Sequence, residues 1–170
     1  LKRDLILNGE FINNNYIQMA NRISEVETLG NLLRKGEFNK LFNLVGIINQ
    51  SDPKQIYLYD AEKIYMKRYQ SNKKLKDLYS ILISQILQRK VHEAEKTLNI
   101  ILDLDKNNGN TLLTKSILNI YAFDRAEARI SIDVAKNLKM SRESHEILQI
   151  AEGLTYILEM KFLNAYRTFI

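Results

Sequence analysis

The stretch ILDLDKNNGN carries alternating oxygen ligands at Asp103, Asp105 and Asn107. Calcium binds carboxylate and amide oxygens, and the loop of an EF-hand begins with such an alternation. An EF-hand loop also needs glycine at its sixth position and a bidentate glutamate at its twelfth. Those two positions hold Asn108 and Thr114, so the sequence does not predict a calcium site.

A turn between two helices explains the same stretch better. Asp103 lies in a stripe of helical spacing that ends at Asp105. Asn and Gly tolerate the left-handed backbone that reverses the chain, and an Asn side chain can accept a hydrogen bond from the first turn of a helix. We expect residues 107–109 to turn the chain and Asn110 to cap the next helix.

No catalytic grouping stands out elsewhere in the sequence. The chain has no cysteine, which excludes disulfides, thiolate zinc sites and cysteine nucleophiles. His92 and His145 each have a glutamate next to them, but adjacent residues of a helix point in different directions and cannot share a metal. Neither the serine-nucleophile motif G-x-S-x-G nor a glycine-rich phosphate loop occurs. We expect no enzyme activity, no metal site and no cofactor.

Positive charge is concentrated in residues 54–76. The chain has a net charge of +5, and this segment carries the whole excess, with seven Lys and Arg against two acids. Tyrosines alternate with the cations, a combination that can stack on nucleic-acid bases or hold an acidic peptide. The alternative is a solvated helix face whose rings border the core. The residues of the expected basic and aromatic patch are Tyr59, Lys63, Met66, Lys67, Arg68, Lys73 and Lys74.

Helices are the elements predicted to position these groups. Pro occurs once and Gly six times, too few for a loop-rich all-β protein. Apolar residues recur at steps of three and four, and no useful length of strand-like alternation occurs. We therefore expect an all-α fold of about ten to eleven helices. The predicted helices span residues 1–8, 11–23, 25–35, 38–49, 54–70, 74–89, 92–104, 110–122, 125–138, 143–159 and 162–170.

Turn signals punctuate the N-terminal third of the chain. NGEF at residues 8–11 and KGEF at residues 35–38 each place a glycine, which can adopt the left-handed helix cap, before a phenylalanine that staples the next helix. Asp52 and Pro53 predict a helix start, because proline is well suited to the first helical turn.

Ala94, Ala128 and Ala165 mark a repeat, with intervals of 34 and 37 residues. Each alanine is followed after four residues by a bulky apolar side chain. Antiparallel helices approach closely where facing residues are small, and a large group one turn away can lock the contact. Each helical pair would leave an apolar face uncovered, so neighbouring pairs must stack. The bulky residues are Leu98, Ile132 and Phe169, and the residues twelve positions before the alanines are Leu82, Ser116 and Gly153.

This pattern resembles the tetratricopeptide repeat (TPR), a family built from helix–turn–helix units of 34 residues. LDLDKNNGNTLL is similar to the linker between TPR units, with Lys106 in place of the usual proline. Residues 75–170 carry the resemblance well and residues 25–53 carry part of it, including the turn at Gly36. The best single unit is AEGLTYILEMKFLNAYRTF, in which the matching residues are Gly153, Tyr156, Phe162, Ala165 and Phe169.

The resemblance implies a fold and a groove. It implies a single domain over residues 1–170, a right-handed α-solenoid of antiparallel helical hairpins, with irregular hairpins in 1–74 and clearer repeats at 75–108, 109–142 and 143–170. In the family, the first helix of each unit lines a concave groove for a peptide or a partner helix. The corresponding positions are mainly apolar here, which suits an amphipathic helix. They are Tyr79, Ile83, Asn110, Leu113, Ile117, Tyr121, Ile150 and Leu154.

The function that the resemblance implies is a non-catalytic protein–protein interaction scaffold within a larger assembly. The alternative is the peptide-sensing part of a transcription regulator, because such proteins also carry irregular repeats of this kind. We expect the partner to be a protein rather than nucleic acid: a peptide or an amphipathic helix, with or without acidic character, or a second copy of the chain.

The location of the protein stays open between cytoplasm and periplasm. No apolar run reaches the length of a membrane span. Because the chain starts at Leu1 rather than Met and stops inside the apolar stretch AYRTFI, we expect a preceding segment, and a further helix or a partner at the other end.

Overall fold

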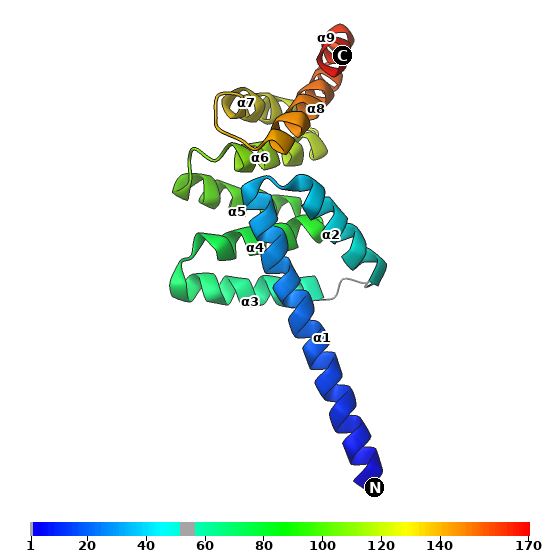
Figure 1. The fold of residues 1–170 in the computed structure, drawn as a ribbon. Coiled ribbons are helices and arrows are strands. Elements are labelled where there is room, and N and C mark those ends of the chain that lie inside the picture. The colour runs from blue at the N-terminus through cyan, green and yellow to red at the C-terminus, as the bar shows by residue number, and fades with distance from the viewer. Residues whose placement is uncertain (1, 52–56) are drawn as a thin grey trace.

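The computed structural model describes residues 2–51 and 57–170. Within these ranges all regular elements are α-helices, which confirms the predicted all-α class (Figure 1). No helix of the described residues combines the length and the apolar character needed to cross a membrane. The helices are α1 (Lys2–Lys35), α2 (Phe38–Ser51), α3 (Tyr57–Asn72), α4 (Leu75–Leu87), α5 (Val91–Leu104), α6 (Gly109–Tyr121), α7 (Arg125–Ala135), α8 (Arg142–Leu158) and α9 (Phe162–Phe169).

The described residues contain nine helices rather than ten to eleven, because three predicted helices run together in α1. Gly9 of NGEF lies inside α1 and does not end it, although a glycine within a helix costs about 1 kcal/mol. Gly36 of KGEF does end it, in the left-handed conformation with φ +71°. The helix start predicted at Asp52 and Pro53 lies outside the described residues.

The second half of helix α1 packs against the other helices. Helix α1 lies against α4 and also contacts α2, α3 and α6, while its first half extends away from the other helices (Figure 1). Val26, Leu29 and Leu33 form the buried stripe of α1, at steps of three and four residues. Burial of each such side chain contributes about 1.5–3 kcal/mol. The stripe therefore accounts for the attachment of α1 to α4.

Three helical hairpins follow one another, α4–α5, α6–α7 and α8–α9, and the two helices of each pack together. The turn of each hairpin holds one residue in the left-handed conformation: Arg89, Phe123 and Met160, with φ 59°, 59° and 61°. The next backbone N–H donates to a carbonyl five residues earlier at 2.9, 2.8 and 2.8 Å, which is a Schellman cap. These turns are spaced by 34 and 37 residues, the intervals of the sequence repeat.

The close helix contact predicted from small residues is confirmed at Gly153. A Cβ atom at this position would lie 2.2 Å from the ring of Phe169, so the ring packs directly on the backbone of α8. Ala165 is buried on the facing helix α9. Gly153 has only a hydrogen atom where alanine has a methyl group, and this allows α8 and α9 to approach each other.

Candidate partner-binding surface

The turn between α5 and α6 is built from its own polar side chains. The side chain of Asn108, and not the predicted Asn110, caps α6, because its Oδ1 accepts a 3.2 Å hydrogen bond from the backbone N–H of Thr111. The Nδ2 group of Asn108 donates to the carboxylate of Asp105 at 3.1 Å. Among the side chains that the structure describes, no three of His, Cys, Asp or Glu form a metal-binding group.

Asn110 instead attaches the end of α1 to α6 and α8. Its Nδ2 donates to the carbonyl of Arg34 at 3.2 Å, and its Oδ1 accepts from Ser144 Oγ at 2.6 Å. Ser141 Oγ donates to the carbonyl of Gly36 at 2.8 Å. The α1–α2 turn is thereby held against the N-terminal ends of α6 and α8, and Asn110 is engaged within the chain.

Helix α1 fills the part of the predicted groove that lies over α4. Tyr79, Ile83 and Leu113 were expected to face a partner, but they are buried. A Cβ atom at Gly30 of α1 would lie 2.9 Å from the backbone of Tyr79 and Ser80, so the two helices are in backbone contact. Burial raises the pKa of Tyr79, whose hydroxyl is 2.6 Å from Thr111 Oγ1. These three predicted groove residues belong to the core.

Of the other predicted groove residues, Ile117, Tyr121 and Leu154 border two apolar hollows, and Ile150 is exposed but lines neither of them. Tyr121, Ile150 and Leu154 have exposed fractions of 61%, 51% and 41%, and Ile117 is half-buried. Two apolar hollows, with volumes of about 400 and 510 Å³, meet at Tyr121; we call them together the open groove. The first is lined by Ile86, Arg89, Val91, Ile117, Leu118 and Tyr121. The second is lined by Ile120, Tyr121, Phe123, Leu154, Ile157 and Leu158.

Phe123 is the groove residue that sequence reasoning missed. It is 79% exposed and adopts a left-handed backbone, a conformation that costs a bulky residue about 1 kcal/mol. The repeat spacing could have identified it, because Phe123 occupies the same position of its hairpin turn as Arg89 and Met160 do in theirs. Large side chains thus occupy turn positions that favour glycine or asparagine.

Arg68 does not belong to the exposed basic patch, although the sequence placed it there. Its guanidinium forms ion pairs of 3.2 Å with both Glu27 and Asp77, and Lys76 binds Glu27 at 2.7 Å. The hydrogen bond from Lys76 holds the pKa of Glu27 below its ordinary value, with a smaller contribution from Arg68 and against the effect of burial. These pairs join α1, α3 and α4, and their role is structural.

The other patch residues lie on the outward face of α3 and the turn after it. Tyr59 and Met66 are 52% and 44% exposed. The ring of Tyr59 has Lys63 Nζ at 4.2 Å and Lys90 Nζ at 5.6 Å from its centroid. Tyr69 likewise has a lysine stacked on its ring, and Tyr65 is buried. The aromatic faces are therefore engaged by cations of the chain itself. The remaining patch residues, Lys67, Lys73 and Lys74, are exposed.

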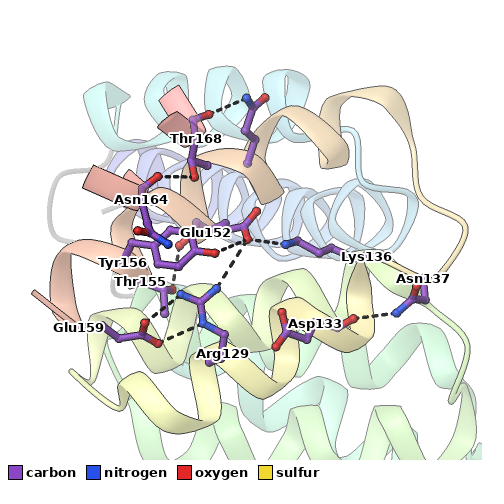
Figure 2. A network of polar contacts seen from close by, with 12 residues as sticks. Arg129, Asp133, Lys136, Asn137, Glu152, Thr155, Tyr156, Glu159, Asn164 and Thr168 are labelled. Carbon is purple, nitrogen blue, oxygen red and sulfur yellow. Dashed lines mark hydrogen bonds and ion pairs between the residues drawn. The ribbon is translucent and has the colours of Figure 1, made fainter. Parts of the chain in front are cut away.

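A second polar network joins α7 to α8 (Figure 2). Arg129 donates to both carboxylate oxygens of Glu159, at 3.1 and 3.2 Å, and its guanidinium carbon lies 4.1 Å from the ring centroid of Tyr156. Glu152 accepts from Lys136, while Lys161 binds Glu159 at 2.9 Å. Each of these cations has a carboxylate partner, so the network fixes the helices in place.

The open groove offers a mainly apolar surface. The two hollows are lined by apolar side chains, with Arg89 as their charged member. The exposed His92 and His145 line neither hollow. No protein-family model, curated protein or solved structure matches the chain.

Proposed function

We propose that the protein is a non-catalytic interaction scaffold that binds an amphipathic helix of a partner protein in the open groove. The observation that carries the proposal is the pair of hollows on either side of Tyr121, next to a surface that the chain covers with its own helix. Helix α1 lies on α4 with a stripe of apolar residues, and the open groove continues with apolar residues of α6 and α8. A second helix with such a stripe suits this continuation.

The solenoid character is part of the proposal. Three successive hairpins share one turn geometry at intervals of 34 and 37 residues, and this supports a degenerate TPR-like array. In such an array, each unit contacts its neighbours and leaves a continuous surface for a partner. The exposed Phe123 and Met160 at the turns support contact along this edge, because exposed apolar side chains in a row are typical of interfaces.

Photo-crosslinking from the groove tests the proposal. A photoreactive phenylalanine analogue at Tyr121 or Leu154 is expected to capture a partner from an extract of the source cells, while the same group at Ile100, which is 45% exposed on α5 and outside both hollows, is not. The captured protein is then purified, and the crosslinked segment is expected to be helical.

Affinity measurements with that partner complete the test. Tyr121→Ala and Leu154→Ala are each expected to weaken binding about tenfold or more, because central aromatic and aliphatic anchors dominate interfaces. Ile100→Ala serves as the matched control and should leave the affinity unchanged. A partner that binds both groove variants as tightly as the unaltered protein would contradict the proposal.

A further inference from the structure

The cations at the two ends of the open groove differ in how far the chain neutralises them. At the α8–α9 end, Arg129 and Lys161 are both bound to Glu159. At the α4–α5 end, Arg89 lines the first hollow, and no carboxylate of the described residues pairs with it. The groove therefore has one end with satisfied charges and one end with an exposed guanidinium.

Tyr59 brings further positive charge to the same end. Its ring carries the ammonium groups of Lys63 and Lys90, and Lys90 directly follows Arg89 in the turn. Lys90 is neutralised by Glu62 at 2.6 Å. Burial opposes the charged form of Glu62, but hydrogen bonds led by that from Lys90 outweigh it and lower its pKa. Lys63 stays exposed on α3.

The outward face of α3 extends this positive region. Lys67 lies one helical turn beyond Lys63, and no carboxylate of the described residues binds it. Asp60 and Glu62 are the acids of this helix, and Glu93 lies in the first turn of α5. Against these three acids, the cations Lys63, Lys67, Arg89 and Lys90 leave a net charge of +1 here. Helix α3 thus presents a cationic surface that adjoins the first hollow at the α4–α5 turn.

Nucleic acid is the less suitable anion for this surface. Binding of single strands depends on aromatic faces on which bases can stack. In this region Tyr59 and Tyr69 are stacked by lysines, and Tyr65 donates its hydroxyl hydrogen to the carbonyl of Ile23 at 2.9 Å within the core. A carboxylate-bearing helix needs no free ring, and its apolar side can enter the neighbouring hollows.

We infer that the helix bound in the open groove belongs to a partner protein and carries acidic residues in the terminal turn that lies against Arg89 and Lys63. This inference rests on the proposed function and adds the orientation and charge of the partner. The acidic turn lies beside Arg89 at one end of the groove, and the apolar stripe crosses both hollows past Tyr121. Complementary charges at one end select the direction in which the helix lies, because the reverse direction leaves its carboxylates next to apolar residues.

Selection from a phage-displayed library of amphipathic helices of about 20 residues tests the inference, since such helices span about 30 Å. The whole 170-residue chain serves as target, unaltered and as Arg89→Glu, Lys63→Glu and Tyr121→Ala. Peptides enriched on the unaltered chain are expected to share Asp or Glu in one terminal turn. Arg89→Glu should weaken such peptides about tenfold, and a Lys-ended version should recover that loss.

Lys106→Glu is the matched control for charge. It changes the net charge equally but lies in the α5–α6 turn, at the opposite end of a helix about 21 Å long. It should leave every affinity unchanged. An equal loss in Lys106→Glu would show that net charge alone acts, and would overturn the inference.

The remaining outcomes separate this inference from the proposed function. Peptides that need Tyr121 but show no acidic preference would overturn the inference and leave the groove intact. Absence of any Tyr121-dependent peptide would overturn both. Binding of a labelled 20-mer of deoxythymidine with the same loss in Arg89→Glu and Lys63→Glu would assign the surface to nucleic acid and would also overturn the inference.

Discussion

The hydroxyl group of Ser141 donates a 2.8 Å hydrogen bond to the carbonyl oxygen of Gly36, which lies 105 residues earlier in the chain. Asn110 adds a link of 3.2 Å to the carbonyl of Arg34. These contacts hold the α1–α2 turn on the ends of α6 and α8, and α1 is thereby directed along α4. The turn at Gly36 thus controls how much of the groove the chain covers and how much stays open.

Gly36→Ala is expected to destabilise the protein by about 2–4 kcal/mol. The new Cβ would meet Ser144 Oγ at 2.3 Å, and the backbone at φ +71° is unfavourable for alanine. Urea denaturation followed by circular dichroism measures the change. Gly46→Ala is the matched control, because no atom lies within 4 Å of its Cβ and alanine favours the helix by up to about 1 kcal/mol. Equal stability of the two variants would contradict the assigned role of Gly36.

Gly30→Ala is expected to loosen α1 from α4. The new methyl group would lie 2.9 Å from backbone atoms of Tyr79 and Ser80, which cannot rotate away as a side chain can. We expect a loss of about 1–3 kcal/mol in spite of the better helix propensity of alanine. Hydrogen exchange should become faster in α1 and α4 and stay unchanged in α9. A stability gain like that of Gly46→Ala would show that the two helices are not in backbone contact.

Ionisation of Tyr65 is expected to lower the stability of the folded protein at alkaline pH. Burial, assisted by the nearby Glu27, raises the pKa of Tyr65 from 10.0 to about 12. A raised pKa in the folded state contributes stability that is complete below pH 10 and is lost as pH rises toward 12, a difference of about 2–3 kcal/mol. Tyrosinate absorbance during a pH titration should show late-ionising rings, Tyr79 among them, and one fewer such ring in Tyr65→Phe. Ionisation of all nine tyrosines near pH 10 in the folded protein would refute this.

Protonation of Glu27 and Glu159 is expected to lower the stability of the folded protein at acidic pH. The hydrogen bond from Lys76 lowers the pKa of Glu27, and that from Arg129 lowers the pKa of Glu159. A lowered pKa in the folded state contributes stability that is present above about pH 4.5 and is lost as pH falls through the folded pKa. Denaturation at a series of pH values should show this loss, with a smaller slope in Glu27→Gln. Glu146→Gln at an exposed ion pair is the control, expected to change stability by less than about 1 kcal/mol.

Phe123→Gly is expected to raise stability and weaken partner binding. Glycine removes the left-handed strain at φ 59° and costs little packing, because Phe123 is 79% exposed, so we expect a gain of up to about 1 kcal/mol. The lost ring leaves the second hollow without one of its walls. Lys73→Gly, at φ 52° outside both hollows, removes the same strain but also the stacking of Lys73 on Tyr69, so we expect a smaller gain and no change in affinity. Unchanged partner affinity in Phe123→Gly would remove Phe123 from the groove.

Helix positions in the second half of the chain were predictable from local patterns. The boundaries of α4 to α9 agree with the expected ones to within three residues, because apolar spacing, turn residues and caps act over a few neighbouring positions. The cap of α6 was assigned to the wrong asparagine. Asn108 and Asn110 are both suitable capping residues, but Asn110 forms hydrogen bonds with the distant residues Arg34 and Ser144, and Asn108 caps the helix. Local propensity cannot choose between two such candidates.

The candidate site was only half predictable. Tyr121 and Leu154 were assigned from the repeat and border the open groove, whereas Tyr79 and Ile83 were assigned by the same rule and are buried. The rule places a residue on a helix face, but it does not say which other helix covers that face. Arg68 illustrates the same limit, since its partners Glu27 and Asp77 lie on α1 and α4.

By itself, the sequence determined the helical class, the 34-residue spacing of the hairpins and the small residues at which helices meet, because these follow from contacts between neighbours along the chain. Tertiary structure alone decided the fate of two nearly identical signals, NGEF and KGEF. The first lies within a helix and the second ends one, where Asn110, Ser141 and Ser144 from distant parts of the chain meet Gly36. That contact positions α1, and the position of α1 leaves the groove open around Tyr121 and closed over Tyr79.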